Sequence, residues 1–240
     1  MTAQERLIKT AMSYVGYIEK KSNKELDSFT ANAGSNNYTA FARDYKEVSG
    51  LDVQGAAWCD TWVDMMFVYT FGAVMAKEML GGFSAYTPTS ANYFKKMNRY
   101  FSKPVSGDVI FFKNSQRIYH TGIVYAVDSK NVYTIEGNTS SASGVVENGG
   151  YVAKKSYSLN YSKIAGYGRP KYELVESEDL IMDKEKFSDI KGHYAEKHIK
   201  KLAECGIVNG YEDGTFRPDE PVTRGQAAVM VANVLNYLGK

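Results

Sequence analysis

The sequence predicts an α+β fold followed by a small helical unit, and two changes in its pattern carry that prediction. Before Pro104, apolar residues recur at helical spacing, and after it they follow the spacing of strands. An acidic and poorly periodic stretch, residues 173–186, then separates this part from a second helical pattern. Because helices precede strands instead of alternating with them, we expect an antiparallel sheet. The domains are therefore expected at residues 1–172 and 187–240, joined by the acidic linker.

The helices before Pro104 are marked by caps and apolar stripes. Thr2 and Glu5 form a capping box that opens the first helix, and Gly16 ends it. Thr89 or Ser90 is expected to cap the last one. The others are expected over residues 39–48, from Cys59 onward, and over residues 73–80.

Apolar runs after Pro104 predict the strands of the sheet. A turn at residues 128–131 joins two of them, which therefore pair antiparallel. In the last domain, an amphipathic helix is expected over residues 194–205, and Thr223 caps a further helix. The strands are expected at residues 105–112, 119–127, 132–136, 151–157 and 164–167.

Composition narrows the class of protein. Hydrophobic residues make up 44% of the 240 residues and charged residues 23%, which is typical of a folded soluble protein. A net charge of +2, without Lys and Arg clustered among aromatic residues, argues against nucleic acid as a partner. No apolar run approaches the length of a membrane span. The N-terminus is too polar for a signal peptide, so we expect the protein to be made in the cytoplasm.

Cys59 stands where a loop gives way to an apolar-periodic helix. A cysteine in a first helical turn lies at the positive end of the helix dipole and near unpaired N–H groups, and both favour the nucleophilic thiolate. A lone cysteine among Trp, Val and Met is as often a core residue, so position alone does not decide its role. The second cysteine, Cys205, falls in the other domain, so both are expected to be reduced.

His120 is the only histidine of the first domain, so it is the one candidate for an imidazole base there. A base of this kind needs a third group to fix its orientation. Antiparallel pairing around the turn at residues 128–131 sets opposite each other residues whose numbers sum to about 259. His120 then lies near position 139, within reach of both Glu136 and Asn138. Either could orient the imidazole, and Glu136 would also stabilise an imidazolium.

Metal and cofactor signals are weak. Residues 209–220 have the glycine and the final glutamate of a calcium-binding loop, but Tyr211 stands where a ligand oxygen is needed. The sequence has no paired histidines and no Cys-x-x-Cys motif to suggest zinc, and no glycine-rich loop to suggest phosphate binding. We therefore expect no metal and no cofactor.

Five short motifs follow one another along the first domain. They are Trp58-Cys59, Gly107-Asp108-Val-Ile-Phe-Phe112, His120-Thr-Gly-Ile-Val124, Thr134-Ile-Glu136-Gly-Asn138 and Gly166-Tyr-Gly-Arg-Pro170. In order and spacing they resemble a CHAP domain, the cysteine-histidine amidohydrolase/peptidase family of peptidoglycan hydrolases. The resemblance implies a papain-like fold of N-terminal helices and an antiparallel sheet.

The same resemblance implies roles for particular residues. Cys59 would be the nucleophile, His120 the base and Glu136 its orienter, with Asn138 as a further polar neighbour. Trp58 and Tyr119, which precede the nucleophile and the base, are expected to contact substrate. Some relatives bind calcium through an Asp-rich loop before the nucleophile, but here that loop offers only Asp52, so no calcium site is expected.

The last domain, residues 187–240, carries a second set of motifs. They are Phe187-Ser-Asp-Ile190, His193-Tyr-Ala195, Gly206-Ile207, Gly210-Tyr-Glu-Asp-Gly-Thr-Phe-Arg-Pro218 and Val222-Thr-Arg-Gly-Gln226. They resemble one S-layer homology (SLH) repeat, a small helical module that binds secondary cell-wall polymers. Two positions depart from the usual pattern: Tyr194 replaces Trp, and Gly225-Gln226 replaces Ala-Glu.

The repeat suggests where a polymer would bind. The resemblance maps the binding motif to Thr223 and Arg224, with Asp213 and Gly214 in the preceding turn, and a guanidinium can pair bidentately with a carboxylate. Three repeats commonly build one binding unit, whereas this chain has one. Either three chains supply the three repeats as a homotrimer, or the groove is incomplete and binding is weak.

Together these resemblances predict a peptidoglycan hydrolase of the phage-endolysin type, either an N-acetylmuramoyl-L-alanine amidase or an endopeptidase. It would be bacteriolytic, reach the cell wall after release by a holin or by lysis, and be held there through its SLH repeat. Two alternatives remain at this point. One is a wall-binding or assembly protein whose CHAP domain is catalytically silent, and the other is a cytosolic amidase of the same fold that acts on a small molecule.

Overall fold

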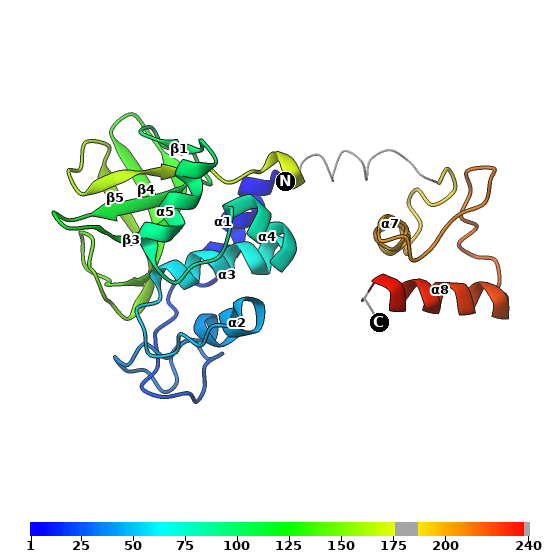
Figure 1. Cartoon of the computed structure of the whole chain (residues 1–240), viewed down its shortest axis with the longest axis horizontal. Helices are drawn as coiled ribbons and strands as arrows, with labels where there is room; N and C mark the ends of the chain where they lie inside the picture. Colours follow the sequence, from blue (N-terminus) through cyan, green and yellow to red (C-terminus); the bar gives the residue numbers. More distant parts are fainter. Residues whose placement is uncertain (176–186, 238–240) are drawn as a thin grey trace. The chain divides into compact units, whose positions relative to one another are not determined.

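The computed structural model describes residues 1–175 and 187–237. The chain divides into two compact units, Met1–Glu176 and Ser177–Lys240, and each is described by itself. Most of the predicted acidic linker, residues 176–186, lies outside the described residues. The first unit is α+β, with its helices preceding an antiparallel sheet, as the sequence predicts (Figure 1).

The helices of the first unit begin close to their predicted starts, with one exception. Thr2 and Glu5 form the expected reciprocal capping box. The last helix begins at Thr87, before both predicted caps, because Pro88 fits a first helical turn and Ser90 is engaged elsewhere. The helices are α1 (Ala3–Ser13), α2 (Ala40–Ser49), α3 (Cys59–Phe71), α4 (Ala73–Leu80) and α5 (Thr87–Lys96).

The sheet has the strand order β1-β6-β2-β3-β4-β5, and all neighbours pair antiparallel. The hairpin of β3 and β4 pairs Ile123 with Ile135 and Val127 with Val132, which is within one residue of the predicted register. The short β1 was not expected from the sequence. The strands are β1 (Tyr100–Phe101), β2 (Val109–Lys113), β3 (Ile118–Val127), β4 (Asn131–Thr139), β5 (Tyr151–Ser158) and β6 (Ile164–Gly168).

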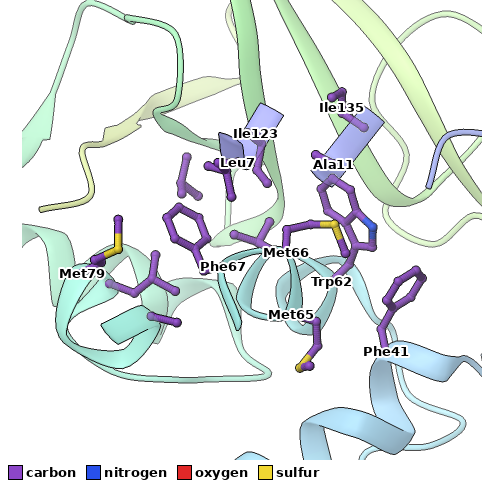
Figure 2. Packing of buried hydrophobic residues seen from close by; sticks show 14 of the residues in the cluster. Leu7, Ala11, Phe41, Trp62, Met65, Met66, Phe67, Met79, Ile123 and Ile135 are labelled. Carbon is purple, nitrogen blue, oxygen red and sulfur yellow. The ribbon is translucent and has the colours of Figure 1, made fainter. Parts of the chain in front are cut away.

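Helix α3 forms the centre of the first unit. It contacts α1, α2 and α4 and also lies against β3 and β4, so nine of its thirteen residues are buried. A helix that is apolar nearly all round is expected in such a position. Figure 2 shows its side chains among those of its neighbours; the labelled residues are Leu7, Ala11, Phe41, Trp62, Met65, Met66, Phe67, Met79, Ile123 and Ile135.

The second unit is small and helical, with α7 (Glu196–Glu204) and α8 (Arg224–Tyr237) joined by a long loop. Helix α8 begins with a capping box between Thr223 and Gln226, so the predicted cap is confirmed. None of its described residues is buried, and Val231 is 61% exposed. The core consists of Phe187, Ile190, Ile199, Ala203, Ile207 and Val208. Every helix in the described residues is too short or too polar to traverse a lipid bilayer.

Two carboxyl groups are buried one turn apart on α3. Asp60 Oδ2 accepts a hydrogen bond from Ser90 Oγ at 2.7 Å, and Asp64 Oδ2 accepts one from the Ser84 N–H at 3.0 Å. Neither pairs with a basic side chain within the described residues. Burial raises the pKa of Asp60 to about 7; burial and the charge of Asp60 raise that of Asp64 well above its usual range.

These raised pKa values make the stability of the fold depend on pH. Between pH 3.8 and about 7 the unfolded chain loses the Asp60 proton while the folded chain keeps it, so stability falls as pH rises through this window. We expect Asp60→Asn to stabilise the protein at pH 8 by about 2 to 4 kcal/mol relative to wild type. At pH 4 the gain should vanish. Urea unfolding at the two pH values measures it.

Asp128→Asn is the matched control, because hydrogen bonds from Lys130, Tyr133 and Asn131 lower the pKa of this exposed carboxyl. Asp128→Asn should lower stability at pH 8 and change it little at low pH. The effect at pH 8 is thus opposite in sign to that of Asp60→Asn. A stability gain for Asp60→Asn that is equal at both pH values would contradict the expected linkage.

Candidate active site

Cys59 is the first residue of α3, a free thiol that is 4% exposed. The preceding residue, Trp58, is the N-cap and makes no side-chain capping bond. The first helical hydrogen bond runs from the Trp62 N–H to the Trp58 carbonyl at 2.9 Å. Trp58 therefore leaves the N–H groups of the first turn, near the sulfur, without a side-chain cap, and the positive end of the helix dipole points the same way.

His120 lies on β3 and is completely buried. Its Nε2 is 2.9 Å from Glu136 Oε2, and its Nδ1 has no oxygen or nitrogen partner within residues 1–175 and 187–237. Burial by itself would lower the pKa of His120, but interactions with Cys59 and Glu136 outweigh burial and raise it to about 10. The imidazole is therefore protonated at neutral pH and lies between a carboxylate and the thiol.

Glu136, on β4, has its carboxylate fixed by a ring of hydroxyl groups. Oε1 accepts a hydrogen bond from Thr134 Oγ1 at 2.6 Å. Oε2 accepts bonds from Tyr157 OH at 3.2 Å and Thr139 Oγ1 at 3.4 Å, besides that of His120. Burial and Glu136 raise the pKa of Tyr157, so its hydroxyl keeps the proton that it donates. The carboxylate thus has one orientation, and it sets that of the imidazole.

Asn138 makes no hydrogen bond to His120. Its backbone is left-handed, with φ of 54°, and both its carbonyl and its Oδ1 accept the Gly149 N–H, at 3.0 and 3.1 Å. It therefore fixes the loop between β4 and β5, while its buried Nδ2 has no partner in the part of the chain that the structure describes. Of Glu136 and Asn138, Glu136 is the one that contacts the imidazole of His120.

Trp58 and Tyr119 are 1% and 7% exposed, so each offers a substrate little more than a ring edge. Trp58 stacks on Phe41 and donates its indole N–H to Glu19. The contacts of Thr134 and Tyr157 with Glu136, and of Glu19 with Trp58, were not predicted from the sequence. The signal for Thr134 was available, because it lies two residues before Glu136 and so faces the same side of the strand.

In the second unit, three of the four predicted polymer contacts take part in local structure. Asp213 accepts bonds from Thr215 and Arg217, which lower its pKa to about 2, and Gly214 supplies a positive φ of 77° to the same turn. Thr223 caps α8. Arg224 is exposed and has no ion pair in the described part of the chain. It begins α8 beside a groove of about 560 Å³ between this helix and the preceding loop.

Comparison with protein families matches both units. Residues 51–138 match the family model of the CHAP domain, and residues 186–228 match that of the S-layer homology domain. The resemblances found in the sequence are thereby confirmed. The CHAP match suggests peptidoglycan hydrolysis, and the S-layer homology match suggests binding to the cell wall.

Curated relatives are similar over short segments. "Cell surface glycoprotein 1" of Acetivibrio thermocellus is 38% identical over 50 residues, which is 21% of this chain and 2% of that protein. "Outer membrane protein SlpA" of Thermus thermophilus is 43% identical over 53 residues, 22% of this chain and 6% of that protein. The match thus spans a small fraction of either relative. A solved chain titled "The crystal structure of Ly7917" aligns with a TM-score of 0.33 and 16% identity, over 71% of this chain and 63% of that one.

The contact between His120 and Glu136 predicts that substitution of Glu136 changes the pKa of the His120 imidazole. In Glu136→Gln the carboxylate charge is lost while the shape is kept, so the pKa of His120 should fall by about one pH unit or more. Interactions with Cys59 and Glu136 raise the folded-state pKa, so the stabilisation that the imidazolium gains from them is complete below pH 6.5 and is lost as pH rises toward 10. NMR of the imidazole ring follows the titration.

The ring signals of His193 and His198 serve as internal references, because both residues belong to the other unit. Their titration should be the same in wild type and variant. A His120 midpoint unchanged by Glu136→Gln would mean that the carboxylate does not hold the imidazolium.

Proposed function

We propose that this protein, whose chain carries a CHAP domain followed by one S-layer homology repeat, cleaves an amide bond of peptidoglycan by cysteine catalysis. The observation that carries the proposal is the buried His120–Glu136 hydrogen bond beside a thiol at the uncapped start of α3. A nucleophile, its base and an orienter are the minimum set for acyl transfer. This combination of domains best fits an endolysin, which is an amidase or endopeptidase that lyses bacteria from within.

In the proposed mechanism, Cys59 and His120 rest as thiolate and imidazolium. The thiolate sulfur attacks the scissile carbonyl carbon, and the uncapped N–H groups at the start of α3 receive the oxyanion. His120 then gives its proton to the departing amine, which leaves a thioester on Cys59. His120 next takes a proton from water, whose oxygen displaces the sulfur and releases the carboxylic acid. Glu136 keeps the ring in place throughout.

The second unit would hold the enzyme at the wall. Arg224 is the candidate for a bidentate contact with a carboxylate of the polymer, since it is exposed and has no partner among the described residues. Val229, Val231 and Leu235 of α8 are exposed apolar residues that a neighbouring repeat could cover. Three chains associated through this helix would supply three repeats, and a single chain would bind more weakly.

Substitution of the nucleophile tests the catalytic proposal. Cys59→Ala should abolish hydrolysis of purified Gram-positive peptidoglycan and leave sedimentation with cell walls unchanged, because only the sulfur is lost. Mass spectrometry of the digest reads the outcome. Free stem peptides from wild type alone would identify an N-acetylmuramoyl-L-alanine amidase. New peptide termini on glycan-linked stems would identify an endopeptidase.

Two results would contradict this function. Hydrolysis that persists in Cys59→Ala would exclude cysteine catalysis. Wall binding without hydrolysis by the wild type, on walls of several chemotypes, would favour a silent CHAP domain in a binding or assembly protein.

Substitution in the repeat tests the wall contact. Arg224→Ala should weaken co-sedimentation with walls about tenfold or more, because a charge-assisted bidentate contact is lost. Lys197→Ala is the matched control, since Lys197 is also an exposed cation at a helix start in the same unit. Equal binding by both variants would argue against Arg224.

Light scattering of the full chain tests the proposed association of three chains. Three times the monomer mass would support the trimer, and the monomer mass would exclude it.

A further inference from the structure

Glu19 is a buried carboxylate for which the mechanism above has no role. It lies in the loop between α1 and α2, is 3% exposed, and pairs with no Lys or Arg in the described residues. Burial raises its pKa, while hydrogen bonds from the Trp58 indole and the backbone of Asn37 lower it. A buried charge without a counter-charge is costly. The presence of Glu19 against Trp58, the residue before Cys59, therefore calls for an explanation.

The backbone of Glu19 is held from two sides. Its N–H donates to the Gly150 carbonyl at 2.8 Å, and its carbonyl accepts the Gly34 N–H at 3.0 Å. Gly150 follows Gly149, whose N–H is bound by Asn138. The position of Glu19 is therefore fixed relative to the segment that leaves the end of β4.

The carboxylate holds Trp58. Glu19 Oε2 accepts the indole N–H at 2.9 Å, and the indole stacks on Phe41 with ring centres 5.7 Å apart. The opposite edge lies against Gly137, where an added Cβ would be 2.9 Å from Trp58 Cζ3. The indole thus lies between Glu19 and the strand end that carries Glu136 and Asn138, while its own backbone leads directly into Cys59.

We propose that Glu19 is a positioning residue that sets the Cys59 sulfur against His120 by holding the Trp58 indole. Trp58 is the N-cap of α3 and makes no side-chain capping bond, so its indole is available as an attachment that holds the start of the helix, in addition to the packing of the core. The inference rests on the proposed function, since it assigns Cys59 as the nucleophile. Displacement of a reacting group by even about 1 Å can cost 100-fold in rate.

The chemistry of the contact explains why a glutamate is present. Two N–H donors, the Trp58 indole and the Asn37 backbone, converge on one group. A carboxylate only accepts, so it satisfies both donors, whereas a glutamine must turn its own NH2 toward one of them. A leucine would satisfy neither and leave the indole N–H buried without a partner.

The test is a double-mutant cycle on the full chain. Glu19→Leu removes the acceptor, and Trp58→Phe removes the donor while keeping an aromatic ring. Each should lower kcat on peptidoglycan about tenfold or more with KM changed less than twofold, and Glu19→Gln should fall between wild type and Glu19→Leu. If Glu19 acts through Trp58, the double variant should lose no more than the worse single variant.

Two further measurements keep the test independent of folding and of substrate. The rate of Cys59 alkylation by iodoacetamide, without peptidoglycan, should fall in Glu19→Leu and Trp58→Phe. The protein has two tryptophans, so its indole N–H NMR spectrum should contain two signals. The one lost in Trp58→Phe should shift in Glu19→Gln, and the other should stay.

Glu25→Gln is the matched control, because Glu25 is an exposed carboxylate in the same loop. Its kcat and alkylation rate should equal those of wild type. Additive losses in the double variant, or equal alkylation rates in wild type and Glu19→Leu, would overturn the proposal. A wild type that cuts no wall would count against the proposed function alone, since the alkylation and NMR measurements need no substrate.

Discussion

The contact of the start of α3 with the start of β3 and the end of β4 is the constraint on which the first unit depends. Two protein segments must meet there closely enough for a thiol and an imidazole to interact. Gly137 makes the approach possible, because a Cβ at this position would lie 2.5 Å from Trp62 Cγ. With α1, α2 and α4 packed around it, α3 has no room to slide along the sheet. The buried core therefore sets the geometry of the candidate active site.

Three buried titratable groups on α3 or against it differ in whether an opposite charge lies beside them. His120 is desolvated, yet it lies between Glu136 and Cys59, and its pKa rises. Asp60 and Asp64 are desolvated without any basic partner in the described residues. Their pKa values therefore rise, which favours the neutral, protonated carboxyl. The first arrangement keeps the imidazole protonated between the carboxylate and the thiol. The second favours the neutral carboxyl on α3 itself. A rise in pH therefore destabilises the fold through Asp60 between pH 3.8 and about 7, well before His120 loses its proton at about pH 10.

The sequence predicted contacts that follow from local pairing and missed those that cross loops. The turn at residues 128–131 fixes the register of β3 and β4, and from it the approach of His120 to Glu136 could be derived. The Glu19–Trp58 bond joins residues 39 positions apart through an irregular loop, where neither period nor register applies. The start of α5 was misplaced for a related reason: Ser90 has the side chain of a cap but donates to Asp60, a partner that only the tertiary fold provides.

The size of each unit explains the contrast between their central helices. The first unit is large enough to surround α3, and nine residues of that helix are buried. The second has a core of six buried residues, and α8, similar in length and also apolar, has none. A domain of this size buries too small a share of its surface to cover both faces of a helix. A single repeat therefore leaves Val229, Val231 and Leu235 of α8 exposed. The Thr223 cap and the exposed position of Arg224 are local features of the start of α8, so they do not require a neighbouring repeat.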